Sequence, residues 1–346
     1  MPKKLEHSTP EPRTLQEAIL YFSDEDNCLA YLVARRWPDG VTCPICGSKE
    51  VIFLANQRRW KCRVKHERQQ FSVKVGTVME DSPIPLTKWL PAMWMIGNCK
   101  NGISSYEIAR DLDVTQKTAW FMLHRVRLAM HDTEPGMLSG TVEADETFVG
   151  GLARNMHKSR KEKTITGTGG SGKTAVMGLL ERHTSEKGKE KVVDSLDYDP
   201  KKDKKASRVK AMVVPNVQRR TLHGEIEKHV APGSEVHTDE WTGYKGLDPV
   251  YVHNVINHAE QYVRGAVHTN GIENFWALLK RMIKGSYVSV EPFHLFCYVD
   301  EEAFRFNERK LTDSERLHNV ASSLAGRCLT YKSLTGKDSI QEPLPA

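Results

Sequence analysis

The N-terminal third of the chain shows three successive patterns of apolar spacing. Apolar residues recur every three or four positions between Leu15 and Trp37, which predicts one or two short helices before Pro38-Asp39-Gly40. Short β-type runs follow, with Cys residues at the turns, and helical spacing resumes from Leu86 to about Ala129. We therefore expect a small β-rich unit between two helical ones.

From Gly140 onward, β-branched runs typical of strands dominate the sequence. Strands are predicted over TVEADETFVGG, TAVMGLLER, RVKAMVVPN, EVHTD and VYVHNVIN. Helical periodicity appears at Leu222–Val230, at Gly271–Lys284 and after Pro292. Strands that come first and then alternate with helices predict an α/β domain over residues 134–310.

The composition is that of a soluble globular protein. Of the 346 residues, 39% are apolar and 27% charged, which excludes collagen-like, coiled-coil and wholly disordered chains. The longest apolar run, Trp89–Ile96, is too short to span a bilayer, and the N-terminus lacks the apolar segment of a secretory signal. We expect a cytoplasmic protein without a membrane partner.

Positive charge is concentrated in one part of the chain. The net charge is +6, but residues 154–220 hold 18 Lys and Arg against 8 Asp and Glu, so the remainder carries −4. A basic block in a near-neutral chain indicates a polyanionic partner, nucleic acid first. A solvated surface loop is the alternative.

Three of the seven Cys residues cluster. Cys43 and Cys46 form a CxxC knuckle, and Cys62 follows 16 positions later, which is typical of a ribbon-type zinc site. Lys65 stands where a fourth Cys would be expected, so His66 is the nearest fourth ligand. Such a site would be structural. The alternative is that the metal has been lost and the thiols remain.

The sequence of residues 104–130 predicts two helices joined by a tight turn. Ser104 and Glu107 form a capping box, Leu112-Asp113-Val114 makes the turn, and Thr115 caps a second helix. A helix of this kind fits a DNA major groove, so the segment is a candidate helix-turn-helix. A helical hairpin packed on the rest of the chain is the alternative. The polar side of the second helix carries Gln116, Lys117, Arg125 and Arg127.

Three acidic residues occupy strand and helix positions typical of metal sites. Asp145 and Asp239 each end a predicted strand, and Glu273 lies in the first turn of a helix. Carboxylates suit hard divalent cations, and these three could converge on two Mg²⁺ ions about 3.5–4 Å apart. Glu143 shares a strand face with Asp145 and is the main rival ligand, whereas Glu146, Glu240 and Asp300 are expected to be solvated or to cap helices.

The helix that carries Glu273 is amphipathic. Lys280 lies two turns after Glu273 on nearly the same face, beside Lys284, so a carboxylate and basic groups share one open side. Phosphodiester chemistry would use such a face, although a solvated amphipathic helix would look the same. The apolar stripe is expected to bury Ile272, Phe275, Trp276, Leu279 and Ile283. For Trp276, stacking on an unpaired DNA base is the alternative.

Taken together, EADETFVGG, HTDEWTGY and HTNGIENFWALLKR followed by GSY resemble the DDE transposases of bacterial insertion sequences. The chain is most similar to the ISXO-like group, which carries an N-terminal zinc ribbon. The resemblance implies a ribonuclease-H-like catalytic domain with Asp145, Asp239 and Glu273 as Mg²⁺ ligands and Lys280 as a DNA contact at the catalytic site. Relatives can carry Asn at the third position, and Asn270 and Asn274 flank Glu273, but Glu273 supplies a full negative charge.

The function that this resemblance implies is DNA transposition. Two Mg²⁺ ions, with Mn²⁺ as a substitute, would serve cleavage and strand transfer, and a structural Zn²⁺ would bind Cys43, Cys46, Cys62 and His66. The partners would be double-stranded element ends and target DNA, bound by a homo-oligomer associated with the nucleoid. The DNA-binding residues are expected to be Lys117, Arg125, Lys280, Arg281 and Lys284.

The expected order along the chain follows from these assignments. It runs from a helical segment (1–38) through a zinc ribbon (39–82), a helix-turn-helix region (83–133) and a DDE domain (134–310, with a basic insertion at 153–207) to a C-terminal tail (311–346).

Two other functions are compatible with parts of the sequence. A non-catalytic DNA-binding regulator with a degenerate nuclease domain would keep the ribbon and the helix-turn-helix but would not need three carboxylates. Gly167–Thr174 matches the P-loop expression, yet no apolar strand precedes it and a strand follows it. We therefore expect no nucleotide partner.

Overall fold

The computed structural model describes residues 10–131, 136–150, 172–182, 206–248, 250–256 and 268–336. Most of the predicted basic insertion and of Gly167–Thr174 lies outside these residues. The chain divides into two compact units: unit 1 comprises Met1–Cys99, Ile103–Met130 and Thr312–Ala346, and unit 2 comprises Lys100–Gly102 and His131–Leu311. No described helix has both the length and the apolar character needed to cross a membrane.

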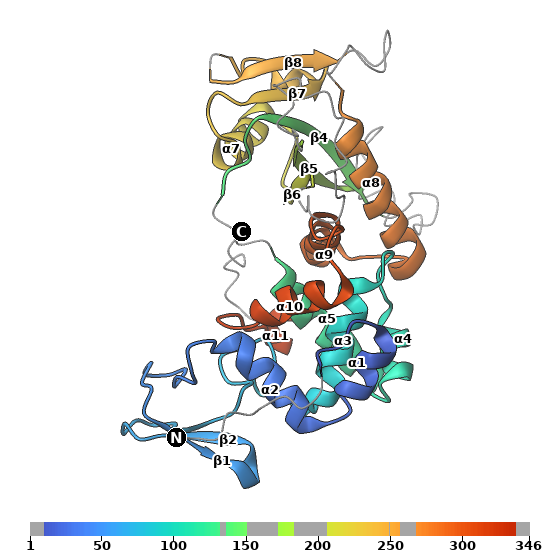
Figure 1. Cartoon of the computed structure of the whole chain (residues 1–346). Coiled ribbons are helices and arrows are strands. Elements are labelled where there is room, and N and C mark those ends of the chain that lie inside the picture. The colour runs from blue at the N-terminus through green and yellow to red at the C-terminus, as the bar shows by residue number, and fades with distance from the viewer. Residues whose placement is uncertain are drawn as a thin grey trace, which may run out of the picture. The chain divides into compact units, whose positions relative to one another are not determined.

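Unit 1 combines helices with a small antiparallel sheet. The sheet has the order β1-β2-β3, and its strands are β1 (Val51–Leu54), β2 (Arg59–Cys62) and β3 (Gln70–Phe71). The helices are α1 (Leu15–Tyr21), α2 (Glu25–Arg36), α3 (Leu86–Asn98), α4 (Ser105–Asp111), α5 (Gln116–Met130), α10 (Asp313–Ser322) and α11 (Tyr331–Leu334) (Figure 1). The two short helices predicted between Leu15 and Trp37 are thus α1 and α2.

The segment predicted as a C-terminal tail contributes helices to unit 1. Thr312 and Glu315 form a capping box that starts α10. Arg316 of α10 donates from its Nε to the Asn98 Oδ1 at the end of α3, over 2.7 Å, and the Asn98 amide donates to the Asp313 carbonyl at 3.3 Å. Residues 312–336 are therefore part of the folded unit.

Unit 2 is built on a five-stranded sheet of order β6-β5-β4-β7-β8. Strands β4, β5 and β6 pair antiparallel, whereas β4, β7 and β8 run parallel. The strands are β4 (Thr141–Val149), β5 (Thr174–Glu181), β6 (Arg208–Val214), β7 (Glu235–Asp239) and β8 (Val252–Ile256). The helices are α7 (Arg219–His229), α8 (Asn270–Met282) and α9 (Leu295–Asn307). The mixed α/β fold expected for this region is confirmed.

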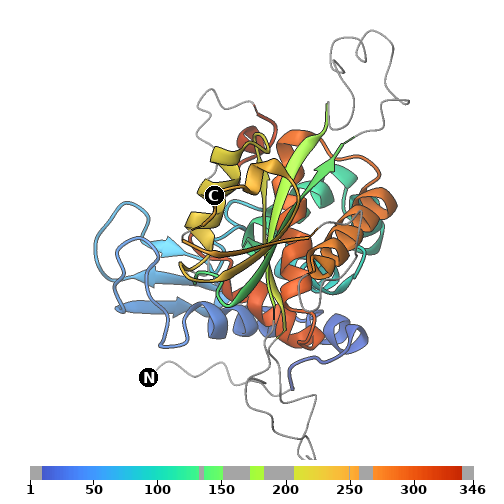
Figure 2. The same ribbon diagram turned by 90° about the horizontal axis from the view of Figure 1, so that it is seen from above.

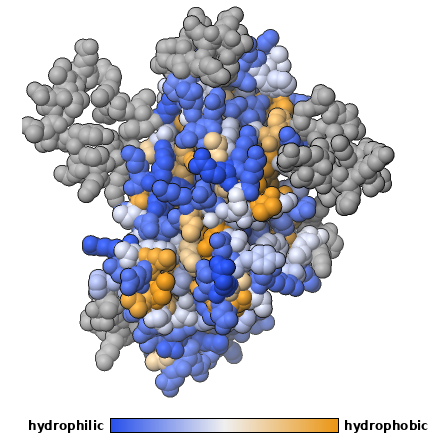
Figure 3. Space-filling model, turned by 90° about the vertical axis from the view of Figure 1, so that its right-hand side faces the viewer, coloured by the Kyte–Doolittle hydropathy of each residue, from blue (hydrophilic) through white to orange (hydrophobic). Residues whose placement is uncertain are grey.

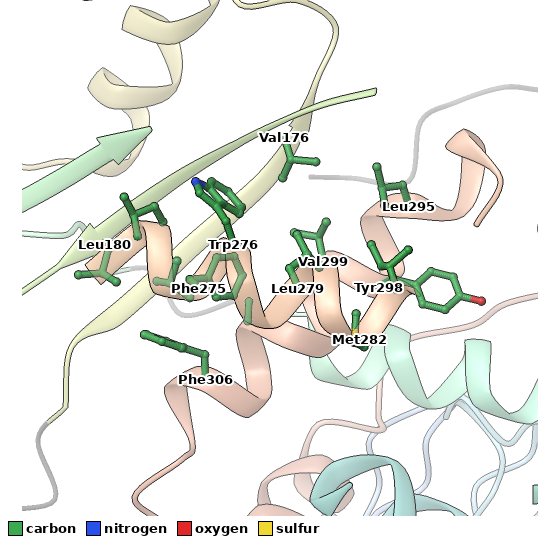
Figure 4. Packing of buried hydrophobic residues seen from close by; sticks show 14 of the residues in the cluster. Val176, Leu180, Phe275, Trp276, Leu279, Met282, Leu295, Tyr298, Val299 and Phe306 are labelled. Carbon is green, nitrogen blue, oxygen red and sulfur yellow. The ribbon is translucent and has the colours of Figure 1, made fainter. Parts of the chain in front are cut away.

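Helices cover both faces of this sheet, α7 on one side and α8 and α9 on the other (Figure 2). Alternation along β5 explains the two cores, because neighbouring residues of a strand point to opposite faces. Ala175, Met177 and Leu179 join the core on the α7 side, and Val176 and Leu180 join the core on the α8 side. Figure 4 shows the second core, where Trp276 and Phe275 of α8 pack between β5 and α9.

The Asn307 side chain at the end of α9 holds the edge strand β6. Its Oδ1 accepts the Val209 N–H at 2.8 Å, and its Nδ2 donates to the Val209 carbonyl at 2.9 Å. Replacing Asn307 with Ala leaves both buried backbone groups unpaired, so we expect a loss of about 1–3 kcal/mol in the free energy of unfolding. Urea denaturation of the two proteins measures this loss.

Asn307→Asp is the matched variant. It retains the acceptor for the Val209 N–H but places a carboxylate oxygen against the Val209 carbonyl. We expect it to be no more stable than Asn307→Ala. An Asn307→Ala protein as stable as the wild type would contradict this role for the side chain.

Candidate functional site

The parallel register of β4 and β7 brings two of the predicted carboxylates together. Thr141 lies opposite Glu235 and Glu143 opposite His237, an offset of 94 residues. The pairing ends two residues before Asp145 and Asp239, which the same offset would align, and the charge of Asp239 acts on Asp145. Asp239 ends β7 as predicted, but β4 continues to Val149, so the prediction that Asp145 ends its strand is wrong.

Helix α8 approaches the sheet closely at Asp145. The indole N–H of Trp276 donates to the Asp145 Oδ2 at 2.9 Å. On the other side of Asp145, β5 presents Gly178, where an added Cβ would lie 2.7 Å from the Trp276 ring. Glycine at this position therefore allows the contact. Trp276 is buried, so the expectation that it belongs to the core is confirmed. A buried ring is not available to stack on a DNA base.

Glu273 is in the first turn of α8, as predicted. It precedes Trp276 by three residues, so both side chains project from the same side of the helix. The Thr269 hydroxyl donates to the Glu273 Oε1 at 3.3 Å. Glu273 therefore lies about one helical turn before Trp276, which contacts Asp145.

The electrostatics of the site show that these carboxylates interact. The pKa of Asp145 is raised to about 6, chiefly by burial and in addition by the negative charges of Asp239 and Glu273, while the Trp276 hydrogen bond acts to lower it. Acidic groups that repel one another in a partly buried site favour a bound cation. The carboxylate oxygens of Asp145, Asp239 and Glu273 do not all lie within 4.8 Å of one another. Among the described residues, only the group of Cys43, Cys46, Cys62 and His66 has its ligand atoms within that distance.

This repulsion predicts a pH dependence for the metal-free protein. The pKa of Asp145 is about 6 in the folded state, above the ordinary value of 3.8, so the folded protein binds more protons between these values. The contribution of Asp145 to the free energy of unfolding is therefore largest at low pH and is lost as the pH rises through 6. We expect the melting temperature to fall between pH 5 and pH 8 without divalent metal, and to fall less in Asp145→Asn.

The control for this melting experiment is Glu240→Gln, which removes an exposed charge next to Asp239. Its pH profile should match that of the wild type. If Asp145→Asn had the same pH profile as the wild type, the raised pKa of Asp145 would not be the cause of the loss of stability.

Glu143, the rival ligand, anchors α8 instead. Its side chain is 1% exposed, and both oxygens are engaged: Oε1 accepts from the Arg182 Nε at 2.6 Å, and Oε2 accepts the Ile272 N–H at 2.8 Å. An added Cβ at Gly271 would lie 2.9 Å from the same Oε2. Glu143 thus ties β4 to the N-terminal end of the helix that carries Glu273.

Glu146 is a residue whose role the sequence did not predict. It was expected to be solvated or to cap a helix, but it accepts a hydrogen bond of 2.6 Å from the buried Tyr244 hydroxyl. Its pKa is raised to about 7, chiefly by burial and in addition by the charges of Asp145 and Asp239. Asp300 instead contacts the His131 Nδ1 at 3.0 Å, and Glu240 is exposed as expected.

The basic residues at the C-terminal end of α8 and just beyond it face solvent. Lys280, Arg281 and Lys284 are exposed, as is Glu273, while the apolar stripe of the helix is buried. The predicted amphipathic helix is confirmed. Figure 3 views the side of the molecule on which α8 lies, and hydrophilic residues predominate over much of unit 2 on that face.

On α5, the predicted exposure holds for Lys117 and is wrong for Arg125. Lys117 is exposed, with its Nζ 4.6 Å from the centre of the Tyr331 ring. Arg125 is 8% exposed and donates to the carbonyls of Glu80 and Leu329 at 2.9 and 3.1 Å. The guanidinium is therefore used inside unit 1, and Arg127, at 1% exposed, is buried as well.

The predicted zinc ligands come together. The ligand atoms of Cys43, Cys46, Cys62 and His66 all lie within 4.8 Å of one another. The Cys46 and Cys62 sulfurs are 3.6 Å apart, and the Cys43 sulfur is 3.4 Å from the His66 Nε2. A tetrahedral Zn²⁺ site, with Zn–S bonds of about 2.3 Å, requires S···S edges of about 3.7 Å. The donor set and its spacing fit structural Zn²⁺.

Two family models match parts of this chain. Residues 137–307 match the ISXO2-like transposase domain, and residues 23–64 match the transposase zinc-ribbon domain. The first match contains all three carboxylates, and the second contains the three zinc-ribbon Cys residues. No solved structure gives a significant match.

Two curated relatives are similar to this chain. An uncharacterized protein in the transposable element ISH50 of Halobacterium salinarum is 27% identical over 277 residues, which cover 77% of this chain and 85% of the relative. An uncharacterized transposase-like protein of Haemophilus influenzae is 35% identical over 105 residues, which cover 30% of this chain and 85% of the relative. The chain therefore belongs to the ISXO2-like transposase family.

Proposed function

We propose that this protein is a DDE transposase that binds the terminal inverted repeats of its element and catalyses metal-dependent strand cleavage and strand transfer. The observation that carries the proposal is that the charges of Asp239, on the parallel strand β7, and of Glu273, on α8, both raise the pKa of the partly buried Asp145. We further propose that unit 2 has a ribonuclease-H-like fold. Three antiparallel strands followed by two parallel ones, in the order β6-β5-β4-β7-β8, support it.

The donor set of this site suits Mg²⁺, with Mn²⁺ as a substitute. All three side chains offer carboxylate oxygens, and their mutual repulsion would be relieved by cations. When bound, the ions would supply activation of water or a 3′-hydroxyl and stabilisation of the leaving oxygen.

The residues around the carboxylates would position them. Trp276 holds the Asp145 oxygen at one edge of the site, and Glu143 fixes the start of α8 and hence the location of Glu273. Both contacts come from buried side chains, so the carboxylates are held by packed groups. Such support is what a site needs to keep its ligands in place for reaction.

Exposed basic side chains would bind the DNA. Lys280, Arg281 and Lys284 lie two or more turns beyond Glu273 and are exposed, so they would contact backbone phosphates away from the reacting one. We also propose that α4 and α5 act as a helix-turn-helix. Since the second half of α5 is buried, DNA contact would come from its N-terminal end, where Lys117 is exposed.

Strand transfer with pre-cut element ends tests this function. Purified protein, a duplex ending in the element's terminal repeat and a supercoiled target plasmid should give joined product with Mg²⁺ or Mn²⁺ and none without divalent metal. A homo-oligomer bound to DNA, also proposed, would appear as a larger complex by light scattering. DNA binding without any joined product under all metal conditions would instead support a non-catalytic regulator.

A further inference from the structure

Trp241 presents an exposed aromatic surface beside the proposed metal ligands. Its side chain is 48% exposed, although it follows Asp239 by only two residues. The Trp241 N–H donates to the Asp239 Oδ1 at 3.0 Å, so the backbone of the tryptophan is tied to a carboxylate of the site. A large exposed indole at this position is not explained by the packing of the sheet.

The indole is held along its Cδ1–Nε1 edge. Its Nε1 donates to the Val217 carbonyl at 3.3 Å. Gly243 lies so close that an added Cβ would be 2.8 Å from the indole Cδ1 and Nε1. These contacts hold the Cδ1–Nε1 edge of the ring, and about half of the side-chain surface remains exposed to solvent. This is the geometry of a fixed stacking platform.

An open hollow of about 520 Å³ adjoins the residue that holds the indole. Its lining includes Val217, the exposed ring of Phe148 and the side chains of Lys173 and Asn216. Arg219 and Arg220 follow in the first turn of α7, which has no acidic residue. Basic groups and aromatic rings on one surface are typical of contacts to a nucleic acid strand.

We propose that the exposed surface of the Trp241 indole binds one unpaired nucleobase of the DNA strand whose phosphate reaches Asp145 and Asp239. The proposal rests on the proposed transposase function. A base inside a duplex has both faces covered by its neighbours, so the platform would take a base at a DNA end or one displaced from the stack. The exposed cations nearby, Lys173 and Arg220, would contact the phosphates that flank it.

Binding without divalent metal tests the platform, because no strand is then cut. The probe is a fluorescent duplex ending in the element's terminal repeat with one unpaired terminal nucleotide. Trp241→Ala should weaken binding by about 5- to 100-fold, the value of one base stacked on an aromatic ring. Trp241→Phe should lose less, because it keeps an aromatic face. Phe293→Ala, which removes another exposed aromatic ring of unit 2, should bind as the wild type does.

The same duplex with an abasic site at the unpaired nucleotide separates stacking from folding. Wild type and Trp241→Ala should bind this abasic probe equally, and 5-iodouracil at the unpaired position should photocross-link to Trp241. Equal losses on both probes, or no loss in Trp241→Ala, would overturn the platform while leaving the transposase proposal intact. If the wild type binds neither probe, the proposed function fails and this inference fails with it.

Discussion

Asp145→Asn, Asp239→Asn and Glu273→Gln are each expected to reduce strand transfer by more than about 100-fold. Each substitution keeps the size of the side chain but removes one negatively charged oxygen ligand. In Asp145→Asn the amide oxygen can still accept from the Trp276 indole, so the packing of α8 should survive. Product formation from pre-cut ends, measured with Mg²⁺ and with Mn²⁺, gives the effect.

DNA binding separates this catalytic loss from a loss of fold. The three variants should bind element-end DNA at least as tightly as the wild type, because each removes a negative charge from a surface proposed to face phosphates. Glu240→Gln, an exposed neighbour of Asp239, is the matched control and should keep its activity. Full activity in Asp239→Asn or Glu273→Gln would exclude that residue as an essential ligand.

Loss of the zinc ligands is expected to have the largest effect on stability. Cys62 ends β2, two residues after Trp60, whose ring stacks on Phe71 at 6.0 Å and meets Trp37 edge-on at 5.6 Å. Without metal, the four ligands would no longer hold this small sheet together. We expect Cys62→Ser to lose zinc and to melt about 10 °C lower than the wild type. Metal analysis and thermal denaturation measure both effects.

Two further variants make the zinc experiment specific. His66→Cys converts the group to four thiolates and should retain one zinc per chain. Cys328→Ser removes an exposed thiol outside the group and should change neither zinc content nor melting temperature. A wild-type protein without zinc, purified under reducing conditions, would contradict the assignment.

Features that depend on local sequence were predicted well. The end of β7 at Asp239 and the start of α8 before Glu273 follow from residue patterns a few positions long. The capping box at Ser104 and Glu107 likewise starts α4 as predicted. In these places the hydrogen bonds and the burial are decided by near neighbours in the chain.

Features that depend on distant contacts were not predictable in the same way. Arg125 was expected on a solvent-exposed face, yet the carbonyls that satisfy it belong to residues 80 and 329. Glu143 looked like a possible ligand because it shares a face with Asp145, and only the position of Arg182 and Ile272 shows that its oxygens are engaged. The pairing of Glu146 with Tyr244 spans 98 residues and has no local signal.

The C-terminal segment is an intermediate case. The capping box at Thr312 and Glu315 was a local signal for a helix, but the expectation for residues 311–346 did not use it. That α10 packs on α3, through Arg316 and Asn98, could not be read from the segment itself. Local signals show that a helix begins there, and tertiary contacts decide that it belongs to unit 1.

Anomalous diffraction from Mn²⁺-soaked crystals tests the central claim most directly, since it locates the metal without relying on activity. With element-end DNA bound, we expect manganese peaks among the carboxylates of Asp145, Asp239 and Glu273, two ions about 3.5–4 Å apart. The peaks should be lost or reduced in Asp239→Asn. Manganese absent from these residues, or bound only elsewhere in the chain, would contradict the claim that they form one metal-binding active site.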